Sequence, residues 1–150
     1  MNITDTTPTE SNLSGLDRKD FQKNINSRKT DLYILKNAQG MEVAVTNYGC
    51  AILSIMVPDK NGKFANVILG HDSIEHVINS PEPFLSTTIG RYGNRIANGK
   101  FTLYGEEHQL TVNNGPNSLH GGPTGFHARV WDAVQPNEST VIFNYTSADG

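Results

Sequence analysis

The sequence predicts an all-β fold, an antiparallel β-sandwich formed by a single domain. Short runs of β-branched and aromatic residues recur along the chain, turn-forming residues separate these runs, and helical patterns are few and brief. Strands at such regular spacing are typical of sandwiches and barrels. The length of 150 residues suits one domain with a sizeable core.

The N-terminal residues differ in composition from the rest of the chain. Residues 1–15 are rich in Thr, Ser, Asn and Pro, so we expect a flexible tail there and the domain over 16–150. The stretch 16–23 can form one helical turn. The predicted strands then follow in order as 31–37, 41–47, 50–59, 64–70, 100–105, 106–114, 129–136 and 139–147.

Turn residues indicate how these strands are joined. Residues 38–40 connect the first two strands as a hairpin, and Gly105 does the same for the pair over 100–114. A short helix is predicted over 73–79, because Ser73 suits the N-cap position and apolar residues recur at helical spacing after it.

The last residues of the sequence resemble the middle of a fold. A predicted strand over 139–147 is followed by Asp149 and Gly150, a turn signal that normally leads into a partner strand. We therefore expect that the domain continues beyond residue 150 and that the chain is truncated.

Composition excludes several classes of function. The net charge is −3 and the pI is about 5.9, so we expect no nucleic-acid partner, which would need clustered Lys and Arg. The single cysteine, Cys50, excludes an internal disulfide and a cysteine-based zinc site. The longest apolar runs are too short to cross a bilayer, and the N-terminus has no secretory pattern. We therefore expect no membrane partner and a cytoplasmic location.

The segment IGRYGNRIANG, residues 89–99, is a candidate binding loop. Two arginines, Arg91 and Arg95, flank the amide of Asn94. Arginine offers a rigid fork of donors, and an amide both donates and accepts, which together suit the hydroxyls of a polyol. The plainer interpretation is that the glycines shape a bend and the arginines are solvated or paired with carboxylates.

The same segment also matches the GXXG loop of a KH domain, which clamps a nucleic-acid backbone. That loop must join two helices, whereas Pro81 and Pro83 precede it here and a predicted strand follows it. The acidic net charge also disfavours this interpretation.

A second loop, NNGPNSLHGG at 113–122, holds His120 among glycines and asparagines. A side chain that titrates near neutral pH in such a loop either caps a turn or is presented to a ligand. His127 follows, but its spacing from His120 fits no standard metal pattern, so no metal site is predicted. The carboxylates are too scattered to indicate a glycosidase-type pair.

Several blocks taken together are more specific than any one of them. In order and spacing they resemble the aldose 1-epimerase, or galactose mutarotase, family over about residues 30 to 150. The blocks are TNYG at 46–49, VPD at 57–59, VILGHDS at 67–73, GRYGNRIANGKF at 90–101, and NNGPNSLHGG at 113–122 followed by GF and VWDA.

The resemblance implies a galactose mutarotase-like supersandwich and a cofactor-free isomerase. Its partner would be a small-molecule aldohexose such as galactose or glucose, whose α and β anomers it interconverts by opening and closing the ring. By their places in the matched blocks, Asn94, Arg95 and His120 would contact the sugar. The resemblance implies no particular oligomeric state.

The chain also departs from the family. The family's general-acid histidine sits in an N-H-x-Y-F-N-type block and its general-base glutamate lies near the C-terminus, and neither block occurs in these 150 residues. No catalytic residue is therefore assigned within the chain, and both groups are expected beyond Gly150. The alternative is a non-catalytic carbohydrate-binding or structural module of the same fold.

Overall fold

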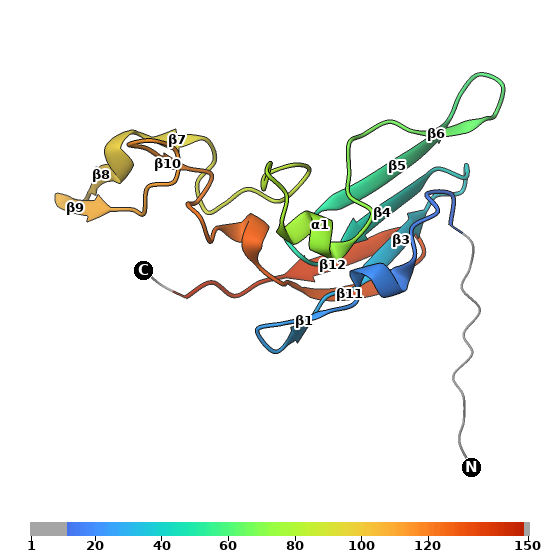
Figure 1. The fold of residues 1–150 in the computed structure, drawn as a ribbon, viewed down its shortest axis with the longest axis horizontal. Coiled ribbons are helices and arrows are strands. Elements are labelled where there is room, and N and C mark those ends of the chain that lie inside the picture. The colour runs from blue at the N-terminus through green and yellow to red at the C-terminus, as the bar shows by residue number, and fades with distance from the viewer. Residues whose placement is uncertain (1–11, 149–150) are drawn as a thin grey trace, which may run out of the picture.

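The computed structural model describes residues 12–148. Its centre is a four-stranded antiparallel sheet with the strand order β3–β4–β5–β6 (Figure 1). Strands β3, β4 and β5 confirm the strands predicted over 31–37, 41–47 and 50–59. The strand-rich, antiparallel architecture confirms the predicted fold class. The strands span Leu32–Lys36, Glu42–Thr46, Ile52–Pro58 and Phe64–Asn66.

The first two hairpins of the sheet show how the sequence sets its register. In the β3–β4 hairpin Leu32 pairs with Thr46, and the turn contains Gly40, whose φ of 84° glycine adopts readily. Between β4 and β5 the pairing shifts by one residue and leaves Leu53 as the extra residue of a β-bulge. Leu53 is 2% exposed, so the bulge directs this side chain into the core.

The main core lies between the sheet and two short helical elements, η1 (Arg18–Phe21) and α1 (Ile74–Ile78). The helix predicted over 73–79 is confirmed, and Ser73 caps it by accepting the backbone N–H of His76 at 3.3 Å. The buried core side chains are those of Phe21, Leu32, Ala44, Ala51, Leu53, Ile74 and Val77.

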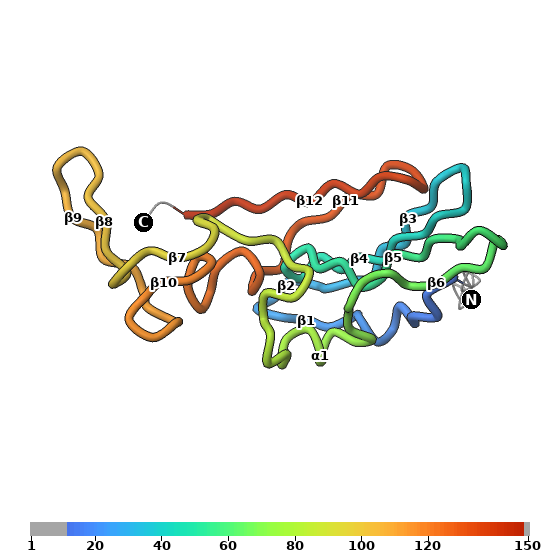
Figure 2. Tube along the Cα trace, turned by 90° about the horizontal axis from the view of Figure 1, so that it is seen from above, coloured from blue at the N-terminus to red at the C-terminus, as the bar shows by residue number. Residues whose placement is uncertain are grey.

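A second layer lies on the other side of the sheet. It is the hairpin of β11 (Asp132–Asn137) and β12 (Thr140–Asn144), and Figure 2 shows it opposite α1 and β1. The ring of Phe143 packs edge-on against Tyr33 of β3, with ring centroids 5.9 Å apart. Two antiparallel layers that face each other through such side chains form a β-sandwich.

A smaller lobe extends from one end of the sheet, at the left of Figure 1. It contains two antiparallel pairs, β7 with β10 and β8 with β9, and the 3-10 turns η2 and η3. The hairpin predicted over 100–114 forms, whereas β7 and β10, like the β1–β2 hairpin beside α1, were not predicted. The bounds are β1 Asn24–Ile25, β2 Arg28–Lys29, β7 Arg95–Ile96, η2 Ala97–Gly99, β8 Lys100–Leu103, β9 Glu106–Gln109, β10 Ser118–Leu119 and η3 Phe126–Ala128.

Some predicted strands are shorter in the structure. The strand predicted over 64–70 ends at Asn66, whose Oδ1 accepts the backbone N–H of Ile55 at 3.0 Å and that of Ile68 at 3.3 Å. This side chain replaces a backbone carbonyl as the acceptor for Ile55, although the N–H of Val67 still donates to the Ile55 carbonyl at 3.0 Å, and the regular ladder ends at Asn66. The strands predicted over 106–114, 129–136 and 139–147 are also shorter, and in the structure they are β9, β11 and β12.

The end of the predicted N-terminal tail is attached to the sheet. Residues 1–11 lie outside the described residues, but the backbone N–H groups of Leu13 and Ser14 donate to the Glu42 carboxylate at 2.9 and 3.1 Å. Glu42 is fully buried, and Lys36 Nζ lies 3.8 Å from its Oε2. These contacts hold Leu13 and Ser14 against β4.

Within residues 12–148, every helix is too short and too polar to reach across a bilayer. The cytoplasmic location expected from the sequence stays a prediction.

Candidate functional site

The two loops singled out in the sequence are joined by the short β7–β10 ladder. Arg95 pairs with Leu119 across this ladder. Just beyond it, the backbone N–H of His120 donates to the Asn94 carbonyl at 3.0 Å, and the backbone N–H of Asn94 donates to His120 Nδ1 at 2.9 Å. Asn94 and His120 therefore touch although 26 positions separate them.

The hydrogen bond at Nδ1 determines which ring nitrogen of His120 can donate. A backbone N–H is a donor only, so Nδ1 must accept, and the proton of the neutral imidazole then sits on Nε2. His120 thus offers one N–H donor on the side of the ring away from Asn94.

Arg95 is held by neighbouring amides. Its Nε donates to Asn114 Oδ1 at 2.9 Å, and its Nη1 donates to Asn94 Oδ1 at 3.2 Å. Asn94 is therefore the residue that links the predicted three, because its side chain contacts Arg95 and its backbone contacts His120. The guanidinium keeps other N–H groups for a ligand, since it has five donors in all.

The glycines allow the two loops to approach backbone to backbone. A Cβ on Gly121, where φ is 85°, would lie 1.9 Å from the Gly90 carbonyl oxygen. Asn94 and His120 also have positive φ, 63° and 54°, a region that few residues other than glycine occupy. The site is therefore built from a backbone that only a restricted set of residues can adopt.

Arg95 lines an open cleft of about 810 Å³ in the smaller lobe. Its walls combine aromatic rings with three guanidinium groups, those of Arg91, Arg95 and Arg129. Arg91 Nη2 donates to Ser147 Oγ at 2.6 Å and also contacts the Ala148 carbonyl. Arg129 was not singled out from the sequence, where no motif marks it.

The structure brings the predicted residues together but does not place all of them on this cleft. Neither Asn94 nor His120 lines it, whereas Gly121 and Gly122, next to His120, do. The imidazole of His120 instead packs edge-on against Phe84, with ring centroids 4.9 Å apart. A shared sugar-facing surface for Asn94, Arg95 and His120 stays a prediction.

Phe84 also contacts a second histidine that sequence reasoning left without a role. The rings of Phe84 and His127 have centroids 4.6 Å apart. His127 is 5% exposed, and within the described residues its Nδ1 has no hydrogen-bond partner. Burial lowers the pKa of His127, and electrostatic interactions with His120 and Arg129 lower it further. No local pattern marks this trio, because it depends on contacts between distant segments.

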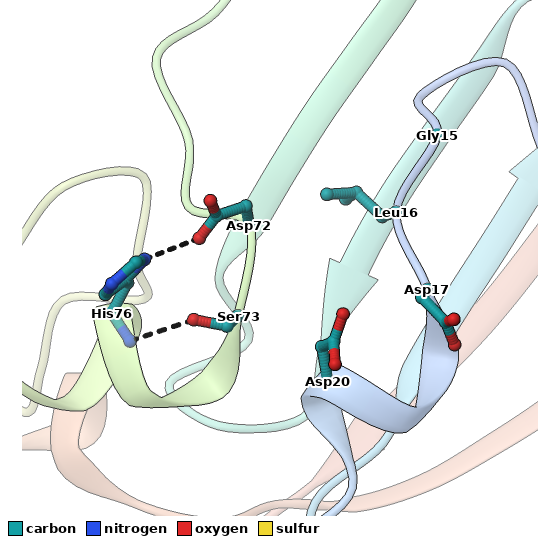
Figure 3. Close-up of a pocket in the computed structure, with 7 residues that line it drawn as sticks. All are labelled: Gly15, Leu16, Asp17, Asp20, Asp72, Ser73 and His76. Carbon is teal, nitrogen blue, oxygen red and sulfur yellow. Dashed lines mark hydrogen bonds and ion pairs between the residues drawn. The ribbon is translucent and has the colours of Figure 1, made fainter.

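A smaller pocket of about 340 Å³ lies between η1 and α1 (Figure 3). His76 Nδ1 and Asp72 Oδ1 are 2.5 Å apart there, and this bond lowers the pKa of Asp72. Among residues 12–148, no group of three or more His, Cys, Asp or Glu side chains is arranged to hold a metal ion. The pocket is lined by Gly15, Leu16, Asp17, Asp20, Asp72, Ser73 and His76.

Comparison with known proteins agrees with the fold and the motifs. Galactose mutarotase of Bos taurus is 40% identical over 110 residues, which are 73% of this chain and 32% of that protein. Aldose 1-epimerase of Escherichia coli (strain K12) is 40% identical over 119 residues, 79% of this chain and 34% of that protein. The chain thus spans about a third of the length of the curated relatives it matches.

Solved structures give the same result. The GalM/aldose epimerase homologue from C. elegans superposes with a TM-score of 0.72 at 33% identity, over 76% of this chain and 35% of that one. The galactose 1-epimerase from Lactobacillus acidophilus NCFM superposes with a TM-score of 0.63 at 32% identity, over 75% of this chain and 32% of that one. Residues 31–150 match the family described as aldose 1-epimerase, and the chain therefore belongs to that family.

Proposed function

We propose that this chain is the sugar-contacting part of an aldose 1-epimerase that interconverts the α and β anomers of aldohexoses such as galactose and glucose. The observation that carries the proposal is the 2.9 Å hydrogen bond from Asn94 N–H to His120 Nδ1. It joins the two sequence blocks that resemble sugar-contacting blocks of the family, and it leaves Nε2–H of His120 as a donor. Arg95, tied to Asn94 at 3.2 Å, adds a rigid cationic fork beside it.

The chemistry suits such donors. Ring opening removes a proton from the anomeric hydroxyl and delivers one to the ring oxygen as the bond between the ring oxygen and C1 breaks. Rotation about the C1–C2 bond and re-addition of the same hydroxyl to the aldehyde then give the other anomer, with no change in oxidation state. Donors aimed at the ring oxygen or at neighbouring hydroxyls stabilise the charge that develops during opening.

In this proposal Asn94, Arg95 and His120 bind and polarise the sugar without transferring its protons. The general acid and general base, a histidine and a glutamate in the family blocks that this sequence lacks, are not residues of these 150. General acid and base groups contribute roughly 10²–10⁴-fold each, so we expect almost no acceleration from binding groups alone.

Polarimetry of freshly dissolved α-D-galactose tests the division of roles. With the purified 150-residue chain we expect a first-order rate within a factor of about two of buffer, because both proton-transfer groups are absent. Full-length aldose 1-epimerase of Escherichia coli is the positive control. Robust acceleration by the chain would show that a residue within it acts as acid or base.

Sugar binding is tested separately by NMR titration of the chain with galactose. We expect galactose-dependent shifts at the side-chain signals of Arg95 and His120. The control is an acyclic polyol such as galactitol, which shares the hydroxyls but has no ring oxygen. Unchanged Arg95 and His120 signals at saturating galactose would exclude the proposed sugar site.

A further inference from the structure

The contacts around Phe84 suggest a role for a residue outside the proposed sugar-contacting set. The ring of Phe84 meets two imidazoles, that of His120 at 4.9 Å with an interplanar angle of 63° and that of His127 at 4.6 Å with an angle of 62°. Both are edge-to-face arrangements, the geometry in which aromatic rings attract. His120 and His127 are therefore coupled through one phenyl ring.

His127 is buried more deeply than either Phe84 or His120. It lies in η3, and its side chain is 5% exposed, whereas Phe84 and His120 are only partly buried. The backbone of His127 is packed against Gly49, where a Cβ would lie 2.3 Å from the His127 carbonyl oxygen. His127 can thus act as a rigid support for Phe84.

His120 needs such a support if its donor is to have one direction. The hydrogen bond from Asn94 fixes the position of Nδ1, but the imidazole can still tilt about that contact. The Phe84 contact is a second restraint on the same ring. Two restraints together define where Nε2–H points.

We propose that His127 is a positioning residue: its buried ring holds Phe84 against His120 and so directs the Nε2–H donor of His120 towards the ligand. The identity of that ligand as an aldohexose rests on the proposed function above. The positioning itself is a property of the protein without sugar.

NMR of the imidazole rings in the 150-residue chain tests the proposal directly, with each histidine signal assigned by a single His→Gln variant. The ¹⁵N shifts give the tautomer, and ¹³C relaxation of the ring C–H bonds gives the mobility of the ring. In the unmodified chain we expect His120 to show one tautomer, with Nδ1 as acceptor and Nε2 protonated, and a rigid ring. In H127A the support for Phe84 is gone, so we expect the His120 ring to become more mobile while the Asn94 hydrogen bond keeps the same tautomer. In H127F an aromatic ring of similar size is kept, and we expect the His120 ring to stay rigid.

His108 offers a matched control. It stacks on Phe101 in the β8–β9 hairpin at 5.0 Å, which is also a histidine–phenylalanine contact but one outside the candidate site. We expect H108A to leave the His120 signals unchanged. If H127A is poorly folded, F84L removes the same restraint from the other side and should give the same increase in the mobility of the His120 ring.

Galactose titration of the same variants links positioning to function. We expect the affinity of H127A for galactose to fall by about tenfold, the factor that corresponds to one lost hydrogen bond, and that of H127F to stay unchanged. An unchanged mobility of the His120 ring in both H127A and F84L would overturn the proposal, and so would an increased mobility in H127F. If neither the unmodified chain nor any variant responds to galactose, the proposed function is wrong. The spectra recorded without sugar still decide the role of His127.

Discussion

The sheet with its two layers and the smaller lobe are built in different ways. Every buried apolar side chain in the described residues belongs to residues 21–77, which include the sheet and the helices that cover it, or is Val130, just before β11. Between residues 89 and 127, the buried positions are instead four glycines, one serine and His127. The sheet is held by the burial of apolar side chains, and the lobe mainly by backbone and polar contacts between loops.

This difference separates stability from binding geometry. Burial of apolar area is the larger source of folding free energy, so the sheet supplies most of the stability. Regions with few buried apolar contacts open more easily than the core, and binding loops commonly belong to them. Substitutions in the sheet should therefore change mainly the free energy of unfolding, and substitutions in the lobe should change mainly the affinity for a ligand.

The largest expected effect is that of F21A. Phe21 is completely buried under α1, and removing such a ring costs about 3–5 kcal/mol of unfolding free energy through lost burial and a residual cavity. Urea unfolding followed by circular dichroism measures this loss. The matched variant F101A, at a ring that is 38% exposed in the lobe, should cost about 1 kcal/mol or less. Equal losses would contradict the division between the two regions.

The next effect is that of G121A. Its Cβ would collide with the Gly90 carbonyl, so we expect the two loops to separate, at a cost of about 2–3 kcal/mol, and galactose-dependent NMR shifts to disappear. The control is G105A, where φ is 86°, almost the same as at Gly121, but nothing lies within 4 Å. We expect G105A to cost only about 1 kcal/mol, from the positive φ alone, and to retain the sugar response. A similar loss of galactose binding in both variants would show that binding does not depend on the close approach of Gly121 to Gly90.

R95K should change binding and leave stability nearly untouched. Lysine keeps the charge but loses the planar fork that bonds Asn94 and Asn114, so we expect galactose affinity to fall by about 1–2 kcal/mol, or 5–30-fold. Isothermal titration calorimetry gives the affinity, and thermal unfolding gives the stability. The control is R18K, the same arginine-to-lysine change at an exposed residue that pairs with Asp31, which should leave galactose affinity unchanged. Unchanged affinity in R95K would remove Arg95 from the binding site.

The smallest expected effect is a pH dependence that originates at His127. Its pKa in the folded state is lowered below the ordinary value of 6.5, so the unfolded chain takes up a proton first as pH falls. The free energy of unfolding should therefore decrease as pH falls from 6.5 towards the lowered pKa, by at most about 1.4 kcal/mol per pH unit.

H127F should abolish this slope and, by removing a buried nitrogen without a partner, raise stability at pH 7.5 by about 1 kcal/mol. Urea unfolding of both chains at pH 7.5 and 5.5 makes the comparison. The same pH slope in the two chains would show that another group is responsible.

The two regions also differ in how far the sequence predicts them. Alternating β-branched residues and turn signals indicated β3, β4 and β5, and Ser73 indicated α1, because these are local patterns with a period. Strands β7 and β10 have two residues each and therefore no period, and their pairing depends on loops that close over distance.

The same limit applies to the candidate site. Asn94, Arg95 and His120 were named from their sequence blocks, and the structure shows that Asn94 contacts the other two. Phe84, His127 and Arg129 carried no signal, since a contact between residue 84 and residues 120 and 127 has no local signature. A single sequence does not show which distant segments pack against each other.

The buried carboxylate of Glu42 defines how far the chain can be shortened from its N-terminus. A version that starts at Asn12 keeps both backbone N–H groups that Glu42 accepts, those of Leu13 and Ser14. A version that starts at Gly15 loses both and leaves the fully buried carboxylate, within the described residues, with the ion pair to Lys36 at 3.8 Å. We therefore expect a version that starts at Asn12 to be more stable than one that starts at Gly15, because the acidic side chain of Glu42 in β4 binds the two N–H groups that separate them.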